Sequence, residues 1–129
     1  MLKSGVLNPA INSLLSRVRH TNYLVIADRG FPFWPDIETV DISLIDNVPQ
    51  VLEVLKAILP NFEVGKAFMA EEFIRENDAA TKTALESVLG DVPITFKPHH
   101  DFKLLVPQAI GLIRTGDTTQ YANIILESS

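Results

Sequence analysis

Two histidines with carboxylates near them in the sequence are the residues of this chain best suited to acid–base chemistry. His20 stands just before the apolar run Tyr23–Ala27, and Asp28 directly follows that run. An imidazole with an unperturbed pKa of about 6.5 can both accept and donate protons at neutral pH. A carboxylate can orient an imidazole or bind sugar hydroxyls. An exposed histidine at a helix end and a turn-forming Asp before Gly30 give the same pattern, so both interpretations stay open.

The second histidine lies in the cluster His99-His100-Asp101, the densest group of titratable residues in the chain. On an extended segment, adjacent histidines point to opposite sides, so the pair would chelate a metal poorly. No HExxH motif is present, and the chain has no cysteine that could act as a partner ligand. We therefore expect no metal site, and we expect one imidazole of the pair to be functional while the other is solvated.

Polar residues near the C-terminus add groups that recognise hydroxyls. Tyr121 and Asn123 open the last apolar run, and strand alternation would place both on one face. Lys103 is expected to be solvated. The pair Glu71-Glu72 falls at a predicted helix start, where the helix dipole favours negative charge, and a structural role is the simpler interpretation.

The elements that must position these residues alternate between helices and strands, which favours an α/β sheet with helices on its faces. Asn8-Pro9 is typical of a helix start, and Pro60 and Gly90 are typical of helix ends. The predicted helices are 9–18, 49–59, 70–76 and 79–89, with a helical turn at 101–106. The predicted strands are 23–27, 37–44, 62–69, 94–96, 109–113 and 122–126.

The segment Phe31–Pro35 contains two prolines, so it can be neither a regular helix nor a central strand, and it is predicted to be a loop. Its aromatic residues Phe33 and Trp34 have two interpretations. They could stack on a sugar ring, or they could form a contact between subunits.

Composition narrows the class of protein. The chain has 129 residues, a net charge of -5 and no cysteines. This length fits a single domain, 1–129. The chain has no cluster of basic residues that would suit the binding of nucleic acid or of a strongly anionic substrate, so a neutral ligand fits better. Disulfides and thiolate chemistry are excluded, and the absence of GxGxxG, P-loop and GxSxG motifs disfavours nucleotide binding and serine hydrolysis. The first residues show no signal-peptide pattern, so we expect a cytoplasmic location.

The predicted sheet also suggests where the site lies. Ligands of open α/β sheets bind outside the carboxyl ends of the strands, and Asp28 occupies such an end. His20 precedes the same strand, so the strand would separate the two residues. A site shared between subunits would bring them together, and we treat this as a hypothesis.

Short segments along nearly the whole chain resemble the D-ribose pyranase and L-fucose mutarotase family, in the order in which that family carries them. Each segment is short, but the ordered set is specific. They are Gly5–Asn8, Arg19–Thr21, Leu24–Asp28 with Gly30 and Pro32, Val40-Asp41, Val48-Pro49, Ala70–Glu72, His99 with Phe102-Lys103, Ile113–Gly116 and Tyr121–Leu126.

This resemblance implies a cofactor-free isomerase that interconverts ring forms or anomers of a free monosaccharide such as ribose or fucose. It implies a ring-shaped homo-oligomer, an octamer or decamer, with sites between subunits. His20 matches the family's acid–base histidine and Asp28 the carboxylate that supports it. The resemblance assigns sugar binding to four further residues: His99, Lys103, Tyr121 and Asn123.

Three other classes of function stay open. A structural oligomer with a vestigial site would show no sugar binding by calorimetry. A non-catalytic monosaccharide-binding or regulatory module of a sugar-uptake operon would bind the sugar without accelerating exchange. A metal-dependent hydrolase would lose its activity with a chelator. Sequence patterns alone do not separate these classes from the isomerase.

Overall fold

A six-stranded mixed sheet runs through the computed structural model, which describes all 129 residues. The strands lie side by side in the order β2-β5-β1-β6-β3-β4. Five of them are parallel to one another, and β6 alone runs antiparallel to its neighbours β1 and β3. The strand bounds are β1 Tyr23–Ala27, β2 Glu38–Asp41, β3 Val64–Ala70, β4 Ile94–Lys97, β5 Ala109–Arg114 and β6 Ile124–Ser128.

The fold contains five α-helices, and two of them start at a local side-chain cap. The Asn8 side chain accepts a hydrogen bond from the Ile11 amide at the start of α1, and Asp78 caps α4 in the same way through Thr81. The helix bounds are α1 Pro9–Arg17, α2 Val51–Ile58, α3 Glu71–Glu76, α4 Ala79–Leu89 and α5 His99–Leu105. Two short 3₁₀ turns, Leu59–Asn61 and Val106–Gln108, follow α2 and α5.

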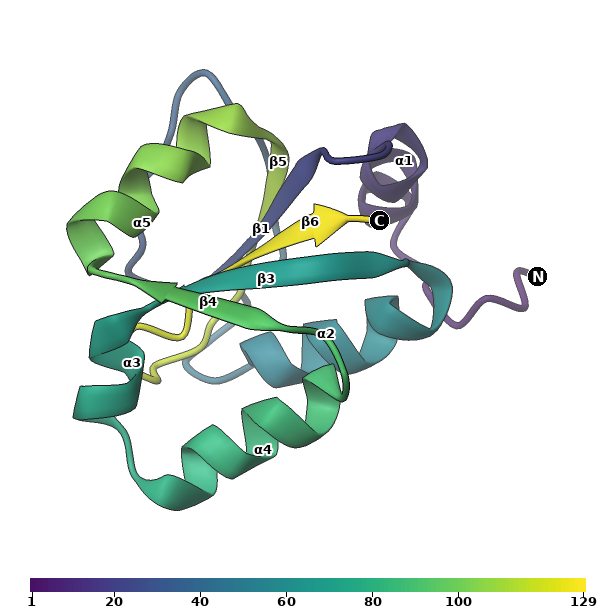
Figure 1. Ribbon diagram of the computed structural model, residues 1–129. Coiled ribbons are helices and arrows are strands. Elements are labelled where there is room, and N and C mark those ends of the chain that lie inside the picture. Colours follow the sequence, from purple (N-terminus) through teal and green to yellow (C-terminus); the bar gives the residue numbers. More distant parts are fainter.

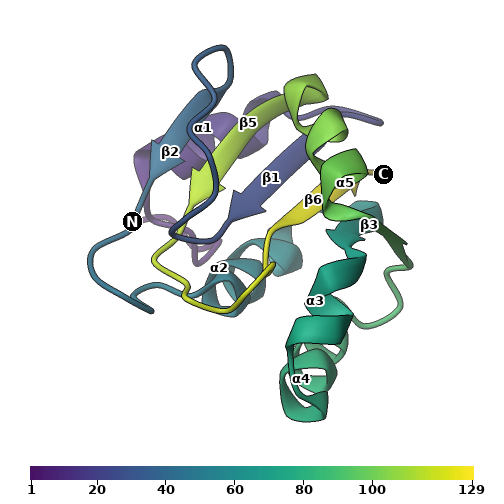
Figure 2. The ribbon, with the colours of Figure 1, turned by 90° about the vertical axis from the view of Figure 1, so that its left-hand side faces the viewer.

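Helices cover both faces of the sheet, as the alternating pattern predicts. Figure 2 shows α5 in front of the strands, with α1 and α2 behind them. The larger hydrophobic core lies on the α1, α2 and α4 side and includes Leu14, Leu55 and Leu85. The smaller core lies under α5 and includes Phe31 and Phe102. The packing is close: a Cβ at Gly111 of β5 would lie 2.5 Å from a methyl carbon of Leu14.

The reversed direction of β6 decides which segments meet. The parallel strands β1, β3 and β4 end at one edge of the sheet, which we call the carboxyl edge. Because β6 is antiparallel, its first residues lie at that same edge. In Figure 1, β3 and β4 end on the left, where α3 and α5 begin. Residues that follow β1 and β4 therefore lie near residues that precede β6.

Two sequence predictions are confirmed with identical bounds, the strand 23–27 and the helix 79–89. Two local predictions are wrong. His99 and His100 do not lie on an extended segment, because they are the first two residues of α5. The last strand begins at Ile124, so Tyr121 and Asn123 precede it in a loop, where Tyr121 has a positive φ of 55°. None of the helices combines the length and the apolar character needed to cross a membrane.

Candidate functional site at the carboxyl edge of the sheet

An open pocket of about 360 Å³ lies at the carboxyl edge. Its lining residues come from the segment after β1, the start of α5 and the loop before β6. They are Asp28, Gly30, Phe31, Pro32, His99, Gln120, Tyr121 and Asn123. Four of the six residues that the sequence assigned to a site thus line one pocket: Asp28, His99, Tyr121 and Asn123.

The Asp28 carboxylate is held by its own turn and by the loop before β6. The Gly30 amide donates to Oδ1 of Asp28 at 2.9 Å, which forms the Asx-type turn expected before a glycine. The Asp28 amide donates to Oδ1 of Asn123 at 2.7 Å. Asn123 is buried, so its side-chain amide fixes the backbone of Asp28 from the loop before β6. This hydrogen bond therefore ties the segment after β1 to the loop before β6.

Burial raises the pKa of the Asp28 carboxyl above its ordinary value, and the nearby Asp117 carboxylate acts in the same direction. Hydrogen bonds from the amides of Gly30 and Phe31 and from the Asn123 side chain favour the ionised form and oppose this shift. The carboxylate is therefore partly desolvated yet remains oriented by donors. These conditions suit a group that accepts hydrogen bonds from a ligand.

The His99 imidazole is surrounded by aromatic rings. It stacks on Phe102 with ring centroids 6.0 Å apart, and it meets the ring of Tyr121 edge to face at 5.1 Å. Phe31, which also lines the pocket, meets His99 edge to face at 6.3 Å. Nδ1 of His99 is buried and has no hydrogen-bond partner within the chain. The ring position is therefore fixed mainly by packing, and its hydrogen-bonding capacity is left unused.

Desolvation lowers the pKa of His99 below its ordinary value, and the positive charge of Lys103 adds to this effect. The carboxylates of Glu72 and Asp28 act in the opposite direction. Because the ordinary pKa of histidine is about 6.5, a lowered pKa leaves the imidazole largely neutral at pH 7. A neutral imidazole can both accept and donate a hydrogen bond, which fits the recognition of hydroxyl groups.

Tyr121 and Asn123 lie on the same side, as the sequence analysis predicted, but strand alternation is not the reason. Both precede β6, and the loop brings both to the pocket. Lys103 lies one helical turn after His99 on α5, half-buried, and it is absent from the pocket lining. His100, the neighbour of His99, is exposed to solvent.

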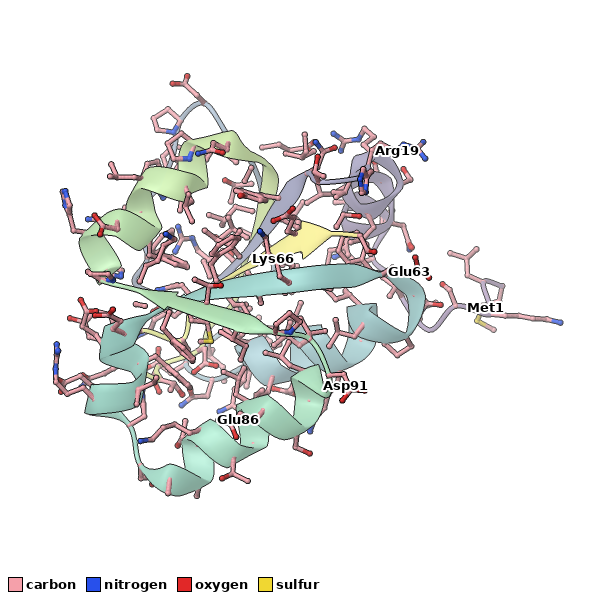
Figure 3. The ribbon with its side chains drawn as sticks, viewed as in Figure 1. Met1, Arg19, Glu63, Lys66, Glu86 and Asp91 are labelled. Carbon is pink, nitrogen blue, oxygen red and sulfur yellow. The ribbon has the colours of Figure 1, made fainter.

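His20 lies away from this pocket. It is exposed and sits in the turn before β1, where the Thr21 amide donates to the carbonyl of Ser128 at the end of β6. Five residues of β1 span about 16 Å, so His20 and Asp28 lie at opposite edges of the sheet. In Figure 3, Arg19, which precedes His20, lies beside α1 on the right, far from the start of α5 on the left. One chain does not bring His20 and Asp28 together.

Two residues that the sequence analysis did not assign to the site support its walls. The Arg114 guanidinium donates to the carbonyls of Asp28 and Pro32 at 3.1 Å each, so it clamps the segment that lines the pocket. Glu72, assigned only to the helix dipole, accepts a hydrogen bond from the His99 amide. The only sequence signal for either residue was its place in the family-like segments Ile113–Gly116 and Ala70–Glu72.

The aromatic residues of the 31–35 loop take different positions. Trp34 is half-buried against Phe31, with ring centroids 6.1 Å apart, whereas Phe33 is 71% exposed. Neither residue lines the pocket. Because the exposed ring of Phe33 lies outside the pocket, a contact between subunits fits this residue better than stacking on a sugar ring.

A second hollow, of about 330 Å³, lies between α2 and α4 and is mostly apolar. Its buried carboxylate, Asp117, already accepts hydrogen bonds from the amides of Val51 and Thr119, so it is fully engaged in holding the fold. The pocket at the carboxyl edge differs because its polar groups converge and are partly unpaired. No group of three or more His, Cys, Asp or Glu side chains is arranged to hold a metal ion.

Comparison with known proteins identifies the family of the chain. The fold is that of a small α/β protein, and residues 1–129 match the model of the RbsD / FucU transport protein family. The chain is 41% identical to a D-ribose pyranase of Geobacillus kaustophilus over 99% of this chain and 93% of that protein. It is 43% identical to a D-ribose pyranase of Halalkalibacterium halodurans over 99% and 97%. The chain belongs to the RbsD / FucU family.

Two solved structures extend the comparison. Bacillus subtilis RbsD complexed with D-ribose superposes with a TM-score of 0.91 and 32% identity, covering 100% of this chain and 98% of that one. Fucose mutarotase from Streptococcus pneumoniae, in complex with L-fucose, gives a TM-score of 0.80 at 21% identity, covering 98% and 94%. The second likeness concerns the fold alone.

Proposed function

We propose that this chain is a sugar isomerase that interconverts ring forms of a free monosaccharide, and that its substrate is D-ribose. The observation that carries the proposal is the convergence of Asp28, His99, Tyr121 and Asn123 on one pocket in a chain 41% identical to a D-ribose pyranase over nearly its full length. The relatives with about 40% identity favour D-ribose over L-fucose as the substrate.

The pocket supplies the groups that a neutral sugar needs. A free pentose offers several hydroxyls, each of which donates and accepts hydrogen bonds. The Asp28 carboxylate accepts hydrogen bonds. The Tyr121 hydroxyl and the His99 imidazole can donate or accept them, and the Asn123 side chain offers an amide. Lys103, beside His99, adds a positive charge near this set. The arrangement therefore selects an uncharged polyol.

Ring interconversion requires proton transfers together with the breaking of one carbon–oxygen bond and the formation of another. A base removes the proton of the anomeric hydroxyl, the bond between the anomeric carbon and the ring oxygen breaks, and a proton is delivered to that oxygen. The resulting aldehyde closes again when a different hydroxyl attacks the same carbon. Protons balance across the cycle, and no electrons are gained or lost. A positioned acid–base group contributes about 10²–10⁴-fold to such steps.

His20 is the proposed acid–base group, and it reaches the pocket from a second copy of the chain. It is exposed at the edge opposite Asp28, which leaves it free to meet the carboxyl edge of a neighbour. Two segments that contribute to the pocket also carry exposed apolar side chains: Phe33 in the segment after β1 and Leu104 on α5 are 71% and 62% exposed. Such side chains suit a subunit contact. The proposed assembly is a ring-shaped homo-oligomer, an octamer or decamer, in which Asp28 of one copy orients His20 of the next.

The experiment is saturation-transfer NMR of D-ribose ring exchange with wild-type protein and the variant His20→Ala. The variant should lose the acceleration of exchange while its circular dichroism and its affinity for ribose stay near those of wild type. His100→Ala, which removes another exposed histidine, serves as the control and should keep full activity. Wild-type exchange rates in His20→Ala would refute the assignment of His20. Ribose binding without accelerated exchange in the wild type would instead identify a binding module.

A further inference from the structure

Glu72 reaches from α3 to the first residue of α5. Its two carboxylate oxygens each lie 3.1 Å from the backbone nitrogen of His99. The sheet explains why these residues meet. Ala70, the last residue of β3, pairs with Lys97, the last residue of β4. Glu72 and His99 each follow two residues later, so the parallel register places them side by side.

This contact supplies a cap that α5 lacks locally. His99 is the first residue of α5, so its amide has no partner within the helix. The preceding residue, Pro98, makes no side-chain cap. A carboxylate that accepts from a free amide at a helix start is a charge-assisted bond, and it also meets the positive end of the helix dipole. Glu72 therefore holds the first turn of α5, which carries His99, against the sheet.

The charge of Glu72 also acts on the imidazole. The charged groups facing His99 are Lys103 on its own helix, Glu72 on α3 and Asp28 after β1, and the titratable Tyr121 packs against the ring. Burial and Lys103 lower the pKa of His99, and Glu72 is the larger of the two carboxylate influences that raise it. Removing the Glu72 charge should therefore lower this pKa further.

We propose that Glu72 is a positioning residue: it holds the first turn of α5, and with it the His99 imidazole, at the pocket, and its negative charge favours the protonated form of that imidazole. This inference depends on the proposed function in one respect, because it assumes that the pocket binds the sugar. The link between Glu72 and His99 stands on the contact itself. Glu71, the exposed neighbour at the same helix start, makes no such contact and gives a matched control.

The test compares Glu72→Gln, Glu72→Ala and Glu71→Gln with wild-type protein. Glu72→Gln keeps an oxygen that can accept from the His99 amide, so it retains the fold while removing the charge. The NMR titration of His99, recorded without sugar, should move to lower pH in Glu72→Gln and stay at the wild-type midpoint in Glu71→Gln. If Glu72 acted only by holding the helix start, the titration midpoint of His99 would be the same in Glu72→Gln as in the wild type.

Ribose binding and exchange complete the test. Glu72→Ala, which loses the acceptor as well, should bind D-ribose roughly tenfold more weakly, because a hydrogen bond to a charged group is lost. In Glu72→Gln the acid limb of the exchange-rate profile should shift to lower pH together with the His99 midpoint. If Glu72→Gln titrates like wild type, or Glu72→Ala binds ribose like wild type, the proposal is overturned. Absence of exchange in the wild type would refute the proposed function, whereas the sugar-free titration would still test the effect of Glu72 on His99 independently.

Discussion

The two edges of the sheet carry very different parts of the proposed site. At the carboxyl edge, groups from three segments converge on one pocket, and each is held by packing or by a hydrogen bond from another element. At the opposite edge, His20 stands exposed in a turn. The first edge has the features of a binding site, whereas at the second edge the exposed histidine lies outside the pocket that Asp28 lines. If His20 is the acid–base group, as proposed, neither edge alone completes the chemistry, and two copies of the chain are needed.

The largest effect should come from Asn123, which joins β6 to the carboxylate side of the pocket. Asn123→Ala leaves the Asp28 amide without its buried acceptor, which should cost about 1–3 kcal/mol of unfolding free energy. The sugar loses both an amide contact and a fixed carboxylate, so affinity for D-ribose should fall by roughly a hundredfold. Calorimetry and chemical denaturation measure the two quantities.

Asn12→Ala is the matched control for this prediction. Asn12 is half-buried and its side-chain amide donates to the carbonyl of Val6, but it lies on α1, away from the pocket. It should leave affinity for ribose unchanged. If Asn123→Ala bound ribose like wild type, binding would not belong to the carboxyl edge, and the comparison between the edges would fail.

A smaller effect should come from Arg114, which does not line the pocket. Arg114→Ala removes two hydrogen bonds to the carbonyls of Asp28 and Pro32, so the segment between them loses its clamp. Affinity for ribose should fall by about tenfold. Arg29→Ala is the control, because its side chain is 56% exposed and pairs only with Asp46 on the surface. Equal effects of the two variants would show that the clamp does not shape the pocket.

Much of the fold could be predicted because its signals are local. The β-branched run Tyr23–Ala27 and the capped segment Ala79–Leu89 were predicted with the bounds that the structure has. The start of α5 could not be predicted this way, because its cap comes from Glu72, which lies 27 residues earlier. Short-range patterns do not encode such a contact.

Some residues of the site could be predicted from local sequence signals, and others could not. Asp28 stood out because it ends a buried strand before a glycine. The clamp by Arg114 joins residues 86 positions apart, so spacing gave no sign of it. The loop position of Tyr121 depends on a positive φ that no residue-type rule indicates for tyrosine. The order of the strands in the sheet therefore brings the pocket residues together, and residue type alone identifies only some of them.

The most direct test of a site shared between copies is co-expression of two inactive variants, His20→Ala and Asp28→Asn. If each site takes His20 from one copy and Asp28 from another, random mixing should restore about a quarter of the wild-type sites. Co-expression of His20→Ala with the double variant His20→Ala/Asp28→Asn is the control and should restore none. Saturation-transfer NMR of D-ribose exchange should therefore show about a quarter of wild-type activity in the first mixture. Activity no greater than that of the separate variants would contradict the shared site.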